Sequence, residues 1–354
     1  MSFRILCRPA AAGTFTRLSN PRVLYASALT AQRSSPRSFS HSRCLKNESQ
    51  KTAVEKESSL ESVLLNPPET TRPPPIELPV RENYASSPSY LWNLARTIAK
   101  FYWKGIKQIN VNRKILTERT ARTPKDDRPS ILSPWKIPET FSRADWILLW
   151  RVRHDLMRLP LFGLMCCVIG ELTVLVVLLF PAIVPLTCRL PNQKRKTIER
   201  SEARRAGIFQ QIEEAYPEGV LSSSMTQGAA RSLVLRNLYL TGNIWETVKA
   251  APPGAWALKG SAHIKYLIGD DKNLLKDGAP SGLIKDELRN ACIERGLNVS
   301  NKSESDLRTL LGDWLRLTNA ESDVERRRRM LTLLLTKQDQ WPAKRDFKLP
   351  EIDL

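Results

Sequence analysis

The stretch LPLFGLMCCVIGELTVLVVLLFPAIVPL, residues 159–186, contains one charged residue, Glu171, in 28 positions. About 20 apolar residues are enough to cross the hydrocarbon core of a bilayer as a helix. Pro160 suits the first turn of such a helix, where a missing N–H costs little, and Pro181 and Pro185 would end it. The sequence therefore predicts a single transmembrane segment at 159–186. The alternative is a buried hairpin in a soluble protein.

Glu171 lies near the middle of this segment, where a carboxylate is costly to place. It could serve in proton or cation movement, or it could hold two helices together through a polar contact. Gly163 and Gly170 lie on one face and would let a second helix approach closely. Because one helix cannot enclose a path, transport would require a homo-oligomer or a partner.

The flanks of the segment do not set its orientation. Trp146 and Trp150 precede it and are expected to be anchors at the membrane interface. Basic residues occur on both sides, so the distribution of charge is similar before and after the segment: Arg151, Arg153 and Arg158 before it, Arg189, Lys194, Arg195 and Lys196 after it.

The N-terminal residues have the composition of a targeting peptide. Of the formal net charge of +19, residues 1–46 contribute eight Arg or Lys residues and no Asp or Glu. Scattered apolar residues without a continuous apolar core indicate a mitochondrial transit peptide. We expect it to cover 1–39, with cleavage near Phe39; a disordered basic tail is the alternative. The Pro-rich residues 40–88 are predicted to be a disordered linker.

Residues 89–158 are predicted to form amphipathic and juxtamembrane helices. The apolar residues at the start of this range recur at helical spacing, with lysines between them. Such a helix could lie on an anionic membrane surface or pack on the rest of the protein. The apolar residues are Leu91, Leu94, Ile98, Phe101, Tyr102, Ile106 and Ile109, and the lysines are Lys100, Lys104 and Lys107.

The remaining chain is predicted to be an all-α domain over 187–338 and a flexible tail over 339–354. A helix is expected to end at Gly296, and the next to begin at Ser303 with Asp306 completing a capping box. The last helix should begin at Ser322, with Glu325 three positions on. Gly269-Asp270-Asp271 is interpreted as the N-terminus of another helix.

No motif favours an enzyme, a metal site or a cofactor. Six cysteines occur without a Cys-x-x-Cys pair, and there are only three histidines. The sequence contains no Gly-rich phosphate loop and no nucleophile elbow. We therefore expect no cofactor, no metal and no small-molecule substrate.

Three separated pieces resemble the LETM family, the leucine-zipper and EF-hand transmembrane proteins of mitochondria. The first is Tyr90-Leu91-Trp92 with Tyr102-Trp103-Lys104-Gly105, and the third is the helical pair around Glu287–Gly296 and Leu307–Leu315. The second surrounds the apolar segment and comprises Arg151, Asp155, Arg158, Pro160, Phe162, Glu171, Pro181 and Pro185.

The resemblance implies a single-pass protein of the mitochondrial inner membrane with a 14-3-3-like helical domain in the matrix. It implies binding of mitochondrial ribosomes, through protein and rRNA, and support for membrane-protein insertion. It also implies a role in K⁺/H⁺ homeostasis, for which a cation/proton exchanger centred on Glu171 is an alternative main function. Because Asp271-Lys272-Asn273 is followed by neither the Gly nor the Glu of a calcium loop, the chain resembles a short member with the ribosome-binding domain only.

Basic residues of the C-terminal helices are the candidates for ribosome contact. They are Lys285, Arg289, Arg295, Arg308, Arg326, Arg327, Arg328 and Arg329. Segment 282–317 also resembles a SAP-type helical pair, so a membrane-attached nucleic-acid binder is a further alternative. Acidic residues interleaved with these cations favour a solvated helix face over a DNA-binding stripe.

Overall fold

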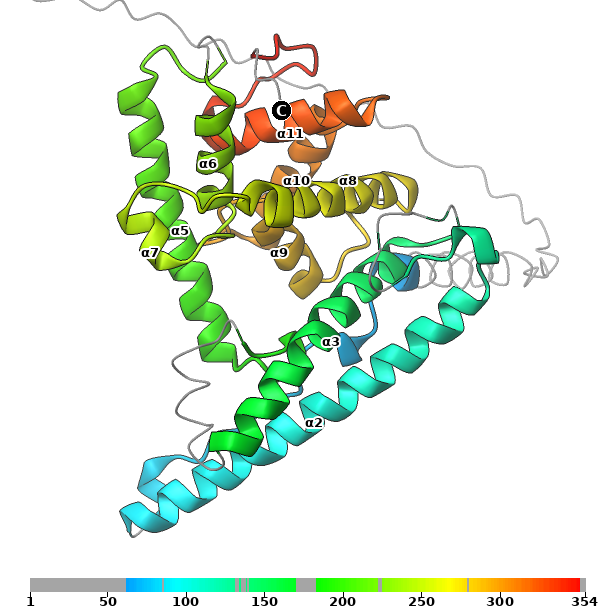
Figure 1. The fold of residues 1–354 in the computed structure, drawn as a ribbon, viewed down its shortest axis with the longest axis vertical. Helices are drawn as coiled ribbons and strands as arrows, with labels where there is room; N and C mark the ends of the chain where they lie inside the picture. Colours follow the sequence, from blue (N-terminus) through cyan, green and yellow to red (C-terminus); the bar gives the residue numbers. More distant parts are fainter. Residues whose placement is uncertain are drawn as a thin grey trace, which may run out of the picture. The chain divides into compact units, whose positions relative to one another are not determined.

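The described residues of the computed structural model form helices joined by loops. They are 62–84, 86–130, 134, 138, 140–169, 183–221, 225–278 and 280–350. No strand occurs among them, which confirms the predicted all-α fold (Figure 1). The predicted transit peptide 1–39, residues 40–61 of the predicted linker and residues 170–182, with Glu171 and Pro181, lie outside them.

Among the described residues, eight α-helices have ten or more residues. Their bounds are α2 (Ser87–Ala121), α3 (Arg143–Ile169), α5 (Pro191–Ala215), α6 (Gln227–Asn237), α8 (Ser261–Lys276), α9 (Lys285–Glu294), α10 (Glu304–Thr318) and α11 (Asp323–Leu335). Short elements connect them: η1 (Glu69–Thr71), η2 (Arg81–Asn83), η3 (Lys125–Asp127), η5 (Leu186–Cys188), α7 (Asn243–Thr247), η6 (Trp256–Gly260) and η7 (Gln338–Gln340).

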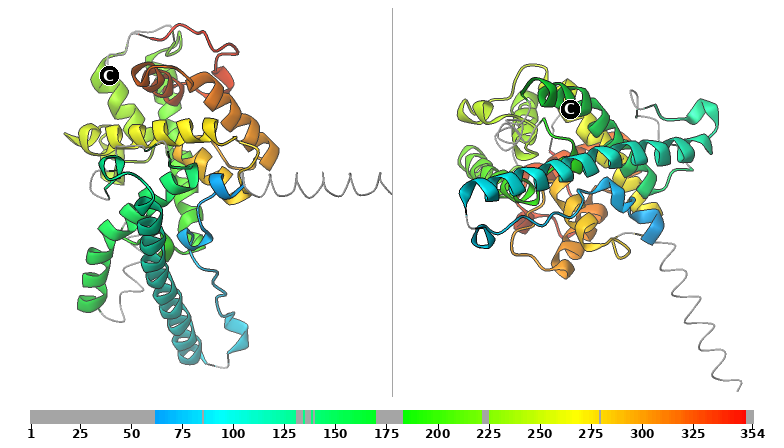
Figure 2. Two further views of the ribbon diagram at one scale, coloured as in Figure 1. Left: turned by 90° about the vertical axis from the view of Figure 1, so that its right-hand side faces the viewer. Right: turned by 90° about the horizontal axis from the view of Figure 1, so that it is seen from below.

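Helices α2 and α3 lie side by side, as Figures 1 and 2 both show. The predicted apolar face of α2 packs against α3 and the segment before α5, and Ile98, Phe101 and Tyr102 are buried there. The Tyr102 and Phe162 rings meet edge to face with centroids 5.8 Å apart. For this face of α2, packing within the protein is therefore the correct alternative.

Helix α3 begins at Arg143 and continues through Pro160, which lies inside the helix. The prediction that Pro160 occupies a first helical turn is therefore wrong. The preceding residues already present a continuous apolar face, including the buried Ile147 and Val152, so packing starts the helix earlier. Among the described residues, no helix combines the length and the apolar character needed to cross a bilayer.

Trp146 is buried in the protein core and is not exposed as a membrane-interface anchor would be. Its indole Nε1 donates a hydrogen bond to the carbonyl oxygen of Tyr266 in α8, at 3.2 Å. Trp150 packs between the rings of Trp146 and Tyr266, with centroids 5.7 Å and 5.1 Å away. The first half of α3 is thereby fixed against α8.

The local helix signals in the C-terminal domain are confirmed. Gly296 has φ +68°, the left-handed conformation that glycine adopts readily after a helix. The Ser303 hydroxyl accepts a hydrogen bond from the Asp306 N–H, and the Asp306 carboxylate accepts one from the Ser303 N–H. Ser322 caps α11 as predicted, although its hydroxyl accepts from Val324 N–H and not from Glu325.

Part of the predicted disordered linker packs against the domain. Leu65 is fully buried, and the Asn66 side chain donates to the Gly282 carbonyl at 2.9 Å and accepts from Ile284 N–H at 3.1 Å. Asn66 and these two partners lie more than 200 positions apart in the sequence. Local composition does not reveal such partners, so the structure differs here from the prediction.

Candidate functional site

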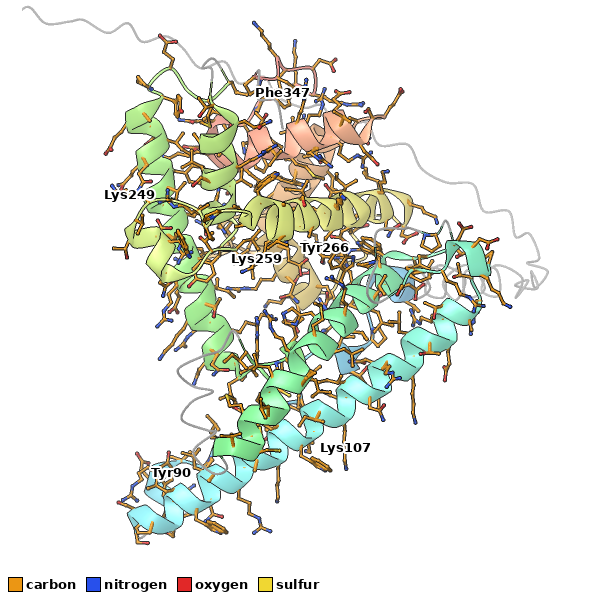
Figure 3. The ribbon with its side chains drawn as sticks, viewed as in Figure 1. Tyr90, Lys107, Lys249, Lys259, Tyr266 and Phe347 are labelled. Atoms are coloured by element: carbon orange, nitrogen blue, oxygen red, sulfur yellow. The ribbon has the colours of Figure 1, made fainter. Side chains whose placement is uncertain are left out.

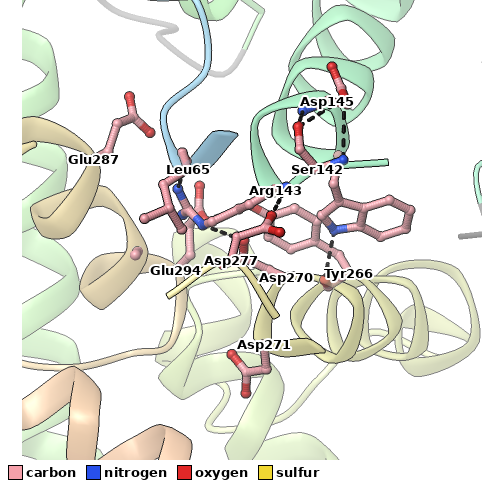
Figure 4. Close-up of polar contacts among 12 residues, drawn as sticks. Leu65, Ser142, Arg143, Asp145, Tyr266, Asp270, Asp271, Asp277, Glu287 and Glu294 are labelled. Atoms are coloured by element: carbon pink, nitrogen blue, oxygen red, sulfur yellow. Dashed lines mark hydrogen bonds and ion pairs between the residues drawn. The ribbon is translucent and has the colours of Figure 1, made fainter. Parts of the chain in front are cut away.

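A cluster of four charged side chains lies buried where α3, α8 and α9 meet. The Arg295 guanidinium contacts Asp270 at 2.6 Å and also pairs with Asp271. On the other side, Arg143 Nε lies 2.9 Å from Asp270. Figure 4 shows Arg143 above α8, where its guanidinium also donates to the Leu65 carbonyl. We call these four residues the buried ion cluster.

The two aspartates of the buried ion cluster differ in their surroundings. Burial alone would raise the pKa of Asp270, but Arg143 and Arg295 together hold it below its usual value. Burial raises the pKa of Asp271, because Arg295 offsets the desolvation only in part. The Trp314 indole also donates to Asp271, at 2.9 Å. The cluster therefore joins α10 to α8 and α9.

These contacts correct the interpretation of Gly269-Asp270-Asp271 as a helix N-terminus, because the three residues lie in the middle of α8. They fall between Leu267 and Leu274, which are both fully buried. An acidic pair within an apolar face would be costly without cationic partners. Because the two aspartates fall within an apolar helix face, the sequence could have indicated that they need buried cationic partners.

A third buried carboxylate, Glu287 of α9, fixes the middle of α3. Arg151 donates to it through two nitrogens, at 3.0 Å and 2.7 Å, and Arg72 reaches it at 3.2 Å. Burial would raise the pKa of Glu287, but Arg151 holds it below its usual value. The acidic residues interleaved with the cations of this region predict a solvated helix face, but Glu287 is fully buried.

Three of the predicted ribosome contacts are structural residues. Arg295 is 0% exposed. Arg326 is buried and donates to the Ala320 carbonyl at 2.7 Å, and Arg329 is buried and donates to the Arg345 carbonyl at 2.7 Å. Side chains committed to the fold in this way present almost no surface to a partner, so these three predictions are wrong.

The other candidates differ in exposure. Arg308 is half-buried and donates to the carbonyls of Pro280 and Ser281 at 3.0 Å and 2.9 Å, which ties α10 to the loop between α8 and α9. Arg327 is also half-buried. Lys285, Arg289 and Arg328 are exposed. Of the predicted set, these three present their charge most fully to solvent.

Lys285 and Arg289 lie one helical turn apart on α9, and the start of α5 adds further cations next to α9. Lys194, near the start of α5, donates to the Asn290 side chain at 2.8 Å. Arg195 and Lys196 beside it are exposed. We define Lys194, Arg195, Lys196, Lys285 and Arg289 as the α5–α9 basic surface. It combines the ends of two helices separated by about 90 residues in sequence.

The residues around the predicted membrane segment make contacts that fix the chain on both sides of residues 170–182. Asp155 is buried and accepts from Leu186 N–H at 2.6 Å. Arg158 lies 3.0 Å from His154 Nδ1, and burial lowers the pKa of its guanidinium. Phe162 is buried against α2, and Pro185 is buried at the start of η5. These residues therefore have a packing role.

Residues 259–337 match the family model described as LETM1-like, RBD. The match runs from the last turn before α8 to the residues after α11, so it includes Asp270, Asp271, Glu287 and Arg295. It also includes Lys285 and Arg289 of the α5–α9 basic surface. No curated protein and no solved structure is similar enough to the chain to count as a match.

Proposed function

Because residues 259–337 match the LETM1-like RBD family model, we propose that the chain is a member of the LETM family and binds mitochondrial ribosomes through the α5–α9 basic surface. The observation that carries this proposal is the exposure of Lys285 and Arg289 on α9, while Arg295 of the same region is buried. Exposed cations can neutralise rRNA phosphates and contact acidic ribosomal proteins.

The proposal places the chain in the mitochondrial inner membrane, with the C-terminal domain in the matrix. The support is the Arg-rich, acid-free N-terminal sequence and the apolar sequence at 159–186. A ribosome held at the membrane by this domain would release nascent chains close to the bilayer. We therefore also propose that the protein assists insertion of membrane proteins made in the matrix.

Cation homeostasis belongs to the proposal through the family resemblance. Its candidate residue, Glu171, lies in the apolar sequence outside the described residues. We expect Glu171→Gln to impair K⁺/H⁺ exchange in mitochondria and to leave ribosome association intact. Intact exchange in the variant would remove Glu171 from this role without affecting the ribosome-binding proposal.

The ribosome-binding proposal is tested by co-sedimentation of the detergent-solubilised chain with mitochondrial ribosomes across a salt series. Lys285→Glu with Arg289→Glu should weaken binding. If both cations meet phosphates, the plot of log affinity against log salt should become less steep, with the magnitude of its slope smaller by about 2. The matched control is Lys344→Glu with Lys348→Glu, which makes the same charge change at exposed residues after α11.

Equal loss in the two double variants would show that net charge alone governs the binding and would refute the assignment to the α5–α9 basic surface. Unchanged binding in the Lys285/Arg289 variant would refute it as well. A SAP-like nucleic-acid binder would instead bind naked RNA or DNA as tightly as it binds the ribosome.

A further inference from the structure

Two tryptophans of α2 point away from the protein core. Trp92 is 67% exposed and Trp103 is 61% exposed. They are eleven positions apart, which is about three helical turns, so they lie on one line along the helix. Large aromatic side chains are seldom left this exposed unless they meet a partner.

The same line along α2 carries positive charge. Arg96, Lys107 and Lys114 follow the two tryptophans at helical spacing and are exposed. The Lys107 ammonium lies 5.4 Å from the centre of the Trp103 ring. Figure 3 shows Lys107 on the side of α2 that is turned away from α3. We call Trp92, Arg96, Trp103, Lys107 and Lys114 the Trp–Lys stripe.

The part of the sequence that contains the Trp–Lys stripe has no acidic residue to balance its positive charge. From 87 to 117 the chain has six Arg or Lys residues and no Asp or Glu. The opposite face of α2, with Ile98, Phe101 and Ile109, is already buried. The Trp–Lys stripe is therefore not needed for packing and has the charge to meet an anionic surface.

The end of α3 shows which anionic surface fits. Leu161, Leu164 and Val168 lie on one line of α3 and are 54%, 61% and 75% exposed. They belong to the half of α3 that packs on α2, since Phe162 contacts Tyr102. After Ile169 the sequence continues as a run of apolar residues with Glu171 as its one charge before Pro181. Exposed apolar residues on α3, together with a basic aromatic surface on the helix that packs against it, favour lipid over RNA.

We propose that the Trp–Lys stripe lies in the headgroup layer of a bilayer that contains anionic phospholipid. Tryptophan favours this layer because one end of the ring is apolar and its N–H is polar. The cations of the stripe meet the phosphates of the lipids, and the helix runs along the membrane surface. This inference rests on the proposed membrane attachment and adds a second contact with the bilayer.

The test uses the full chain reconstituted in vesicles whose lipids carry bromine near the headgroup, which quenches tryptophans located there. Replacing Trp92 and Trp103 by Phe should remove most of the quenching. The matched control replaces Trp245 and Trp256, which are half-buried, by Phe and should retain it. Equal quenching in the wild type and the Trp92/Trp103 variant would overturn the proposal.

A second arm tests the charge. Arg96→Glu with Lys107→Glu should reduce quenching on vesicles that contain phosphatidylglycerol, with each charge changing the association constant of the helix about five-fold. On phosphatidylcholine alone the effect should be much smaller. The variant Lys285→Glu with Arg289→Glu should leave quenching unchanged. If the α2 variant instead lost ribosome co-sedimentation and kept its quenching, the stripe would face RNA and the proposal would be wrong.

Retention of the chain on vesicles after a high-salt wash reports separately on the membrane attachment. A chain that washes off refutes the attachment itself. A chain that stays on while its stripe tryptophans are not quenched refutes only the surface contact of α2.

Discussion

The α8–α11 domain and the α2–α3 pair are held together by different forces. In the domain, charges from distant parts of the sequence pair in the interior, as Arg295 does with Asp270 and Asp271. Between α2 and α3 the contacts are mainly apolar, with an ion pair between Arg119 and Asp145, and the cations of the Trp–Lys stripe are exposed. An arginine is thus structural where the helices bury it, as they do Arg295, and available for partners where it stays exposed, as Arg96 and Arg289 do.

Helix α3 belongs to both regions, which explains how they are joined. Its first half carries Arg143 and Arg151, whose guanidinium groups pair with Asp270 and Glu287 of the domain. Its second half carries Phe162, which packs on α2. A force that acts on α2 can therefore reach the domain through one continuous helix.

The largest effect is expected from breaking the buried ion cluster. Arg295→Met would leave Asp270 and Asp271 with fewer cationic partners in the interior, where unpaired charge is strongly disfavoured. We expect a loss of about 3–5 kcal/mol in the free energy of unfolding. Denaturant unfolding followed by tryptophan fluorescence measures it.

The control for that experiment is Arg289→Met, on the exposed face of α9. It should change the unfolding free energy by less than about 0.5 kcal/mol. A similar loss of unfolding free energy in both variants would contradict the view that the buried ion cluster stabilises the domain more than exposed charges do.

A smaller effect is expected from crowding the contact between α2 and η5. A Cβ atom at Gly105 would lie 2.7 Å from the Cys188 sulfur and 2.8 Å from the Thr187 carbonyl oxygen. Since the carbonyl is backbone and cannot move aside easily, Gly105→Ala should cost about 1–3 kcal/mol. Thermal unfolding of the solubilised chain measures the change.

Gly163 of α3 provides the matched comparison, because a Cβ atom there would meet nothing within 4 Å. Gly163→Ala should be neutral or should stabilise the helix by up to about 1 kcal/mol. If both alanine variants behaved alike, the close approach of α2 and η5 would not be important for the α2–α3 region.

The smallest effect concerns a feature that belongs to α10 alone. Ser303→Ala removes the acceptor for the Asp306 N–H and should destabilise the domain by about 1 kcal/mol. Thr309→Ala, exposed in the same helix, should be close to neutral. A loss as large as that of Arg295→Met would contradict the view that local caps contribute less than buried charges.

Part of the candidate site was predictable and part was not. Lys285 and Arg289 were predicted as ribosome-contact candidates and are exposed. The contribution of Lys194 was missed because the contact between α5 and α9 joins residues 96 positions apart. Trp92 and Trp103 were noted only as family-like residues, since their exposure depends on which face of α2 packs on α3.

By itself the sequence determined the features that local chemistry controls. These are the all-α class, the cap at Ser303, the helix end at Gly296 and the apolar face of α2, because each depends on neighbours within a few positions. The tertiary structure alone decided which charges are buried. Asp270 meets Arg295 from 25 positions away and Arg143 from still farther, so their burial follows from how the helices pack.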